Sequence, residues 1–317
     1  MSYSLSAVSS ILEIPALLGA YASGLGFDVD TTNPDQPIIS NPVDPTSAVP
    51  FRFRATVASL VHELICEPVG APEVTSSAFT RSPILNGTTQ LPTAVAFIGG
   101  LTPQPFIATV IFYGDNLVRH LYYGHMEKLG AYSGGEVIGG VTGPLGTSPS
   151  TLTYRSNRYL FQARQSAVDL DRSGGVYVGH IDNPNPWRVF RATTALSPLT
   201  GFTNAQALGG FGDDVNDGYL ARGRSPFAGV NVLTPINLFA TEPITGSASF
   251  RPLGCPAGVR LVNMQDLAVG ARVEIAGEYW RCYPATRRST EQNMPVGTGN
   301  YRASETSFMV GYAYFEG

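Results

Sequence analysis

The sequence is poor in charged residues, and poorest in lysine. Only 14% of its 317 residues are Asp, Glu, Lys or Arg, against about 25% in an average soluble domain. Lys128 is the only lysine among 20 basic residues, and the other 19 are arginines. Arginine is favoured at desolvated interfaces because its planar group pairs bidentately and stacks on aromatic rings; GC-rich coding is the alternative explanation. Since a free monomer usually needs a charged coat, we expect neighbouring proteins to cover much of this surface.

Cysteines are also few, and long apolar runs are missing. Cys66, Cys255 and Cys282 form neither a CxxC pair nor a disulfide framework, which is typical of a chain assembled in a reducing cytosol. A bridge between Cys255 and Cys282 stays open. No run reaches the roughly 18 apolar residues of a membrane span, and residues 1–10 lack the basic residues of a signal peptide. With a net charge of −4, we expect no membrane role and no reading of nucleic-acid sequence.

Glycine and proline are plentiful, at 35 and 24 residues. Both break helix interiors, so many turns and few long helices are expected. From Tyr132 onward, short apolar or alternating runs are separated by Gly, Pro, Asn and Asp, which is typical of a sandwich or barrel. We predict an α+β fold that is predominantly β. A small α/β domain over residues 1–135 would precede a β-sandwich or barrel-like domain over residues 136–317.

Two helices are predicted, over residues 4–23 and 115–130. The first has an apolar stripe at helical spacing, and Pro15 would kink or restart it. Residues 59–67 fit either a strand or a short helix. Strands are predicted over residues 26–30, 51–57, 94–98, 106–112, 259–263, 272–275, 279–283 and 308–314, with a hairpin turn at Gly277-Glu278.

A possible catalytic motif lies at His120, His125 and Glu127. Zinc proteases carry two histidines four residues apart on one helical face, with a glutamate directly after the first. Here the histidines are five apart, and Leu121 follows the first. We therefore predict no zinc site and no catalysis, and interpret this segment as a polar and aromatic contact surface.

Two acidic loops are candidate cation sites. The loop that begins at Asp169 starts like a calcium loop, but its twelfth position is His180, where a glutamate is usual. A second loop clusters three carboxylates beside glycines. Ordinary turns are the alternative for both loops, and we expect no metal or cofactor. The candidate ligands are Asp169, Asp171, Asp213, Asp214 and Asp217.

Two stretches carry a family resemblance. Residues 119–140 (RHLYYGHMEKLGAYSGGEVIGG) resemble a segment of large virion proteins of tailed bacteriophages. The stretch from Phe250 (FRPLGCPAGVRLVNMQDLAVGARVEIAGEYWRCYPATRR) and the ending GYAYFEG are similar to C-termini that recur in phage structural proteins. The N-terminal layout of a helix, the strand GFDVD, proline loops, strands and a second helix resembles neck or tail-completion (tail-terminator-like) proteins. In that family the α/β domain forms a ring, although its members are usually much shorter.

The resemblance implies a structural component of a tailed-phage virion, located in the virion and assembled in the host cytoplasm. It would form a homo-oligomeric ring at the head–tail neck or tail end, with copies of itself and other virion proteins as partners. A capsid decoration or tail-fibre-base protein is the alternative. A carbohydrate-binding β protein, with Trp187, Tyr279 and Trp280 as stacking residues, is the alternative of another class. The expected interface residues are Arg119, Tyr122, Tyr123, Glu127, Arg287 and Arg288.

Overall fold

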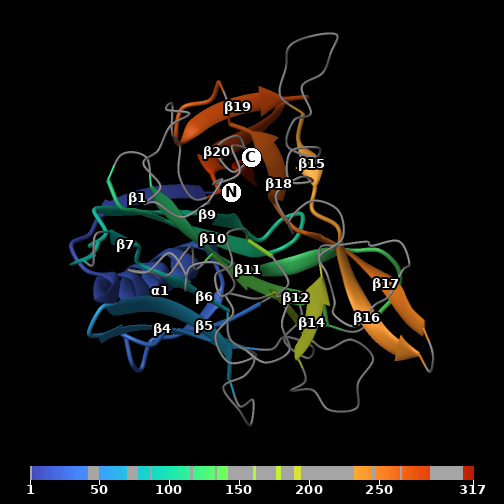
Figure 1. The fold of residues 1–317 in the computed structure, drawn as a ribbon, viewed down its shortest axis with the longest axis horizontal. Coiled ribbons are helices and arrows are strands. Elements are labelled where there is room, and N and C mark those ends of the chain that lie inside the picture. The colour runs from blue at the N-terminus through green and yellow to red at the C-terminus, as the bar shows by residue number, and fades with distance from the viewer. Residues whose placement is uncertain are drawn as a thin grey trace, which may run out of the picture.

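The chain is built almost entirely from antiparallel strands, as the computed structural model shows (Figure 1). The structure describes residues 2–41, 50–69, 78–85, 88–114, 117–132, 134–141, 160–161, 176–179, 189–193, 232–244, 247–264, 266–285 and 310–317. Within these ranges it has a single α-helix, α1 (Ile14–Leu25), preceded by the 3₁₀ turn η1 (Ile11–Glu13). The prediction of a predominantly β fold is confirmed.

A nine-stranded sheet forms the middle layer, in the order β1-β9-β10-β11-β12-β13-β14-β16-β17. Its strands are β1 (Ser2–Ala7), β9 (Ala94–Gly100), β10 (Phe106–Phe112), β11 (Val118–Lys128), β12 (Glu136–Gly140), β13 (Val176–Gly179), β14 (Val189–Thr193), β16 (Leu238–Ile244) and β17 (Ser247–Pro256). Strand β17 also pairs with the far end of β11, so the strands from β11 to β17 close into a ring. Residue 135 falls between two paired strands of this sheet, and the division into two domains stays a prediction.

Each face of the middle sheet is covered by another layer (Figure 1). On one face lie α1 and a sheet in the order β2-β3-β4-β5-β6; on the other lies a sheet in the order β15-β18-β21-β20-β19. The first sheet consists of β2 (Asp28–Asp30), β3 (Ile38–Ser40), β4 (Phe51–Ala58), β5 (Val61–Pro68) and β6 (Ala78–Arg81). The second consists of β15 (Thr234–Pro235), β18 (Val259–Asn263), β19 (Ala271–Ile275), β20 (Glu278–Pro284) and β21 (Val310–Phe315). A small hairpin pairs β7 (Ile84–Leu85) with β8 (Thr88–Thr89).

Two hydrophobic cores hold the three layers together. The N-terminal core fills the space between α1, the β2–β6 sheet and the middle sheet, and includes Leu18, Phe51, Phe97, Leu121 and Tyr123. The C-terminal core lies on the other face and includes Phe106, Tyr122, Phe161, Tyr312 and Tyr314. The middle sheet is therefore apolar on both faces where the two outer layers cover it.

The predicted helix over residues 4–23 is only partly correct. Residues Ser2–Ala7 form β1, which pairs with β9, and the helix begins later. The Ser10 hydroxyl accepts a hydrogen bond from the Leu12 amide and caps η1. Pro15 lies in the first turn of α1, where its missing N–H costs nothing, so it starts the helix rather than kinking it. Gly26 ends α1 in the left-handed conformation, with φ +92°.

The predicted helix over residues 115–130 is wrong, since these residues contain β11, the longest strand of the middle sheet. Strand β11 is buried on both faces for most of its length. Each set of alternating side chains therefore mixes apolar or aromatic residues with polar ones, and the period-two pattern of a half-exposed strand is lost.

Most of the other predicted elements are confirmed. Strand β2 lies in the segment GFDVD, and residues 59–67, left open between strand and helix, belong mainly to β5. The hairpin between β19 and β20 turns at Ala276 and Gly277, with φ +54° and +84°, and Glu278 already belongs to β20. Two successive positive φ values match the turn type that two-residue hairpins favour.

Candidate interaction site

The segment expected to form a contact surface lies in β11, a strand that is buried over most of its length. Arg119, Tyr122 and Tyr123 are each at most 2% exposed. Alternate residues of β11 point to opposite faces, so Tyr122 lies in the C-terminal core and Tyr123 in the N-terminal core. The three side chains hold layers of one chain together, and this corrects their assignment to an exposed interface.

His120 joins β11 to the C-terminal sheet. Its Nε2 donates to the Pro284 carbonyl at 2.8 Å, so Nδ1 of the neutral ring accepts from the Tyr314 hydroxyl at 2.9 Å. Burial lowers the pKa of His120 to about 3, against an ordinary value of 6.5. Both ring nitrogens are therefore occupied and the ring is neutral, which leaves it no role as a metal ligand or accessible base.

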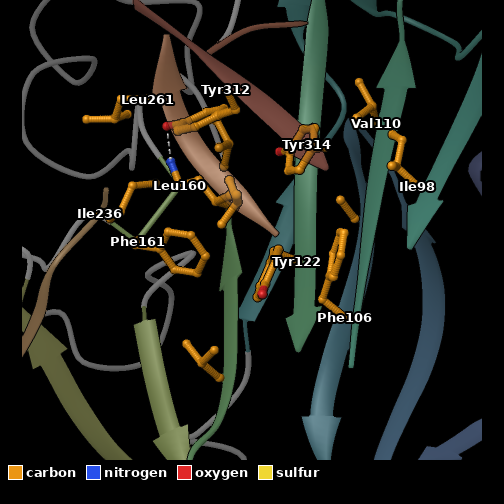
Figure 2. Packing of buried hydrophobic residues seen from close by; sticks show 14 of the residues in the cluster. Ile98, Phe106, Val110, Tyr122, Leu160, Phe161, Ile236, Leu261, Tyr312 and Tyr314 are labelled. Atoms are coloured by element: carbon orange, nitrogen blue, oxygen red, sulfur yellow. Dashed lines mark hydrogen bonds between the residues drawn. The ribbon is translucent and has the colours of Figure 1, made fainter. Parts of the chain in front are cut away.

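Three tyrosines, Tyr122, Tyr312 and Tyr314, lie in the C-terminal core (Figure 2), and the rings of Tyr312 and Tyr314 contact His120. The Tyr122 ring stacks on Phe106, and its hydroxyl donates to the Ala257 carbonyl at 2.6 Å. The Tyr312 hydroxyl accepts from the Leu160 amide at 2.7 Å. Burial raises the pKa of Tyr122 well above its usual value, so its hydroxyl stays protonated and acts as a hydrogen-bond donor in the core.

Arg119 is a buried cation on the other face of β11. Its Nη1 donates to the Val118 carbonyl at 3.1 Å, and burial lowers its pKa to about 10. Tyr113 lies near it, bonded to the Ser82 hydroxyl at 3.1 Å, and burial raises the pKa of Tyr113 to about 12. At neutral pH the arginine is charged and the tyrosine is not.

Glu127 is partly exposed, but its carboxylate already has a partner. Arg260 of β18 donates to both carboxylate oxygens, at 3.0 and 2.9 Å, and lies over the Trp280 ring at 5.6 Å. This ion pair ties β11 to the C-terminal sheet. Glu127 therefore works within the chain in this structure, and a role in an interface stays a prediction.

Of the remaining candidates, some lie in the described part of the chain and the others lie outside it. Trp280 is 5% exposed and packs on Phe315, so it offers no face to a sugar, while the Tyr279 ring is covered by Arg272 at 3.7 Å. Cys66, Cys255 and Cys282 are free thiols, so the possible Cys255–Cys282 bridge is not formed. Outside the described residues lie Arg287, Arg288, Trp187 and the acidic candidates Asp169, Asp171, Asp213, Asp214 and Asp217.

The feature that sequence reasoning missed is the open edge of the middle sheet. Strand β1 is its outer strand, and no strand in the described part of the chain pairs with the outer edge of β1. Its sequence SYSLSA has no charge, and Leu5 is 56% exposed. The alternation of Ser with Tyr, Leu and Ala over residues 2–7 was the signal for a strand, and the helical spacing of Leu5, Val8 and Leu12 masked it.

Comparisons with known proteins add no family: no family model matches the chain, and no curated protein matches it. Among the described residues, no group of three or more His, Cys, Asp or Glu side chains is arranged to hold a metal ion. No helix in the same ranges has the length and apolar character to cross a membrane. The candidate site is the uncharged outer edge of β1.

Proposed function

We propose that this protein is a structural component of a tailed-phage virion that works through protein–protein contacts and catalyses nothing. It assembles with copies of itself, as a ring at the head–tail neck or tail end, and with other virion proteins. Its chemistry-bearing side chains in β11 serve the fold, and its charge-poor surface suits burial by neighbours.

One observation carries this proposal. Described residues of the two stretches that resemble phage virion proteins, residues 119–140 and the region from Phe250 onward, pair and bond with each other. Strand β11 pairs with β17 over residues 126–128 and 254–256. His120 bonds to β20 and β21, and Glu127 bonds to β18. Resemblance in two distant stretches that fold against each other supports a shared module better than resemblance in either stretch alone.

The first experiment measures the mass of the purified full-length protein by light scattering, from dilute to high concentration. A closed ring of about six subunits supports the neck or tail-end assignment. A stable trimer supports a decoration or fibre-base protein instead. A monomer at every concentration contradicts self-assembly. Mass spectrometry of purified phage particles tests virion membership separately, and absence of the chain from them refutes it.

A further inference from the structure

Sheet edges in natural proteins are normally protected against pairing with other chains. Charged residues, prolines, very short strands and covering segments are the usual means. In the middle sheet, β17 pairs with β11 over its last three residues, and the rest of its edge carries Arg251 and Pro252. In the N-terminal sheet, β6 is buried along its length, and β2 is three residues long and carries Asp28 and Asp30.

The C-terminal sheet is protected in the same ways. Strand β15 has two residues, one of which is Pro235. Strand β19 carries Arg272 and Glu274. Among the described sheet edges of the three main layers, β1 alone has none of these protections, because its six residues include no charge and no proline.

Strand β1 is also held firmly in position. It pairs with β9 along its whole length, and the Tyr21 hydroxyl donates to the Ser2 carbonyl at 2.6 Å. On the opposite face, the Arg281 guanidinium lies over the Tyr3 ring at 3.9 Å and is neutralised by Glu316 at 2.9 Å. A strand fixed on both faces loses little conformational freedom when another strand adds to it, which favours binding.

We propose that β1 is a strand-addition site whose occupant is β1 of a second copy of this chain. The two strands pair antiparallel about a two-fold axis at Leu5, so Leu5 lies opposite Leu5 of the second copy. Ser4 lies opposite Ser6, and Tyr3 opposite Ala7. The two middle sheets then form one continuous sheet across the dimer.

The sequence of β1 fits a second copy of β1 better than it fits the other sheet edges of the chain. In this register Tyr, Leu and Ala share one face and the serines share the other, so the apolar and polar faces of both copies match. No charge is placed opposite another charge. Pairing with β2 would instead bury Asp28 and Asp30 against an uncharged strand, at a cost in desolvation. This contact does not depend on virion membership.

The test compares two leucines with equal exposure. Leu5 and Leu129 are both 56% exposed, but Leu129 follows β11, away from β1. In the two-fold register, Leu5→Lys places two like charges opposite each other, so the dimer dissociation constant should rise at least about tenfold in sedimentation velocity runs. Leu129→Lys should leave it unchanged. At protein concentrations where the wild type is monomeric, both variants should keep its urea midpoint, since neither side chain is buried in the single chain.

A crosslink checks the register. In a Cys255→Ser background, Leu5→Cys should give an intermolecular disulfide under mild oxidation, because directly opposed residues lie within reach of each other. Leu129→Cys should give none. A wild-type chain that stays monomeric overturns the proposal, as does an association that survives Leu5→Lys or is lost in Leu129→Lys. If the dimer forms but the chain is absent from phage particles, the proposed function fails and this inference stands.

Discussion

Tyr122 and Tyr123 are adjacent in β11 and both are buried, but their hydroxyl groups differ in whether they make a hydrogen bond. The Tyr122 hydroxyl donates to the Ala257 carbonyl at 2.6 Å, and Ala257 is itself buried. The Tyr123 hydroxyl is buried and has no hydrogen-bond partner in the described residues. Removing one oxygen from each ring therefore has different consequences. Tyr122→Phe should lower the free energy of unfolding by about 1–2 kcal/mol, because it leaves a buried carbonyl without its donor.

Tyr123→Phe should change stability by about zero or raise it slightly, since it removes a hydroxyl whose burial is not offset by a hydrogen bond. Urea denaturation of both variants and the wild type, followed by tryptophan fluorescence and circular dichroism, measures the difference. Each variant is the other's control for ring packing. Equal effects of the two substitutions would refute this account of β11. So would a Tyr122→Phe variant that fails to assemble at wild-type stability, because that result would place Tyr122 in an interface.

Three further predictions concern the contacts around β11. His120 has a folded pKa of about 3 and an ordinary value of 6.5, so the unfolded chain binds an extra proton between these pH values. Stability should therefore fall as pH drops through this window, and His120→Gln should flatten the decline in urea midpoint. Gly277→Ala, at φ +84° in open space, should lower the free energy of unfolding by about 1–2 kcal/mol, because an alanine is strained in this conformation. Gly254→Ala, at φ +131°, should lower it further, because its Cβ would clash with the Glu127 carbonyl. Thermal denaturation of both variants measures the difference. Glu127→Gln should cost about 1 kcal/mol or less, and about 1 M salt should remove most of that difference, because the ion pair with Arg260 is partly exposed.

Local patterns predicted the strands that have one exposed face or a clear turn beside them. The alternation FRFRATV gives β4, and glycine at a two-residue turn gives the β19–β20 hairpin. These signals are local, since each depends on a few neighbouring residues and on the solvent on one side of a strand. The predominantly β fold class follows from the same signals, repeated along the chain with glycine and proline between them.

Strand β11 could not be predicted in this way, although its neighbours in the chain, β9 and β10, were predicted as strands from their apolar runs. Strand β11 contains leucine, methionine, glutamate and lysine, which are good helix formers, and burial on both faces removes its alternation. Its cover comes partly from residues more than a hundred positions later in the sequence, such as Pro284 and Tyr314, which bond to His120. The contact surface expected at Arg119, Tyr122 and Tyr123 failed for the same reason. A cluster of aromatic and charged residues fits a surface or a polar core equally well until the layers that cover it are known.

Strand β21 determines when this fold can be completed during synthesis. It lies between β18 and β20, and Tyr314 reaches His120 across 194 residues of sequence. Until residues 310–315 leave the ribosome, β18 and β20 have no strand between them, and the apolar face of β11 lacks part of its cover. The nascent chain must therefore keep the aromatic face of β11 partly uncovered until residues 310–315 are made, which slows folding and favours aggregation. A chaperone that shields such surfaces should raise the yield of soluble protein on expression.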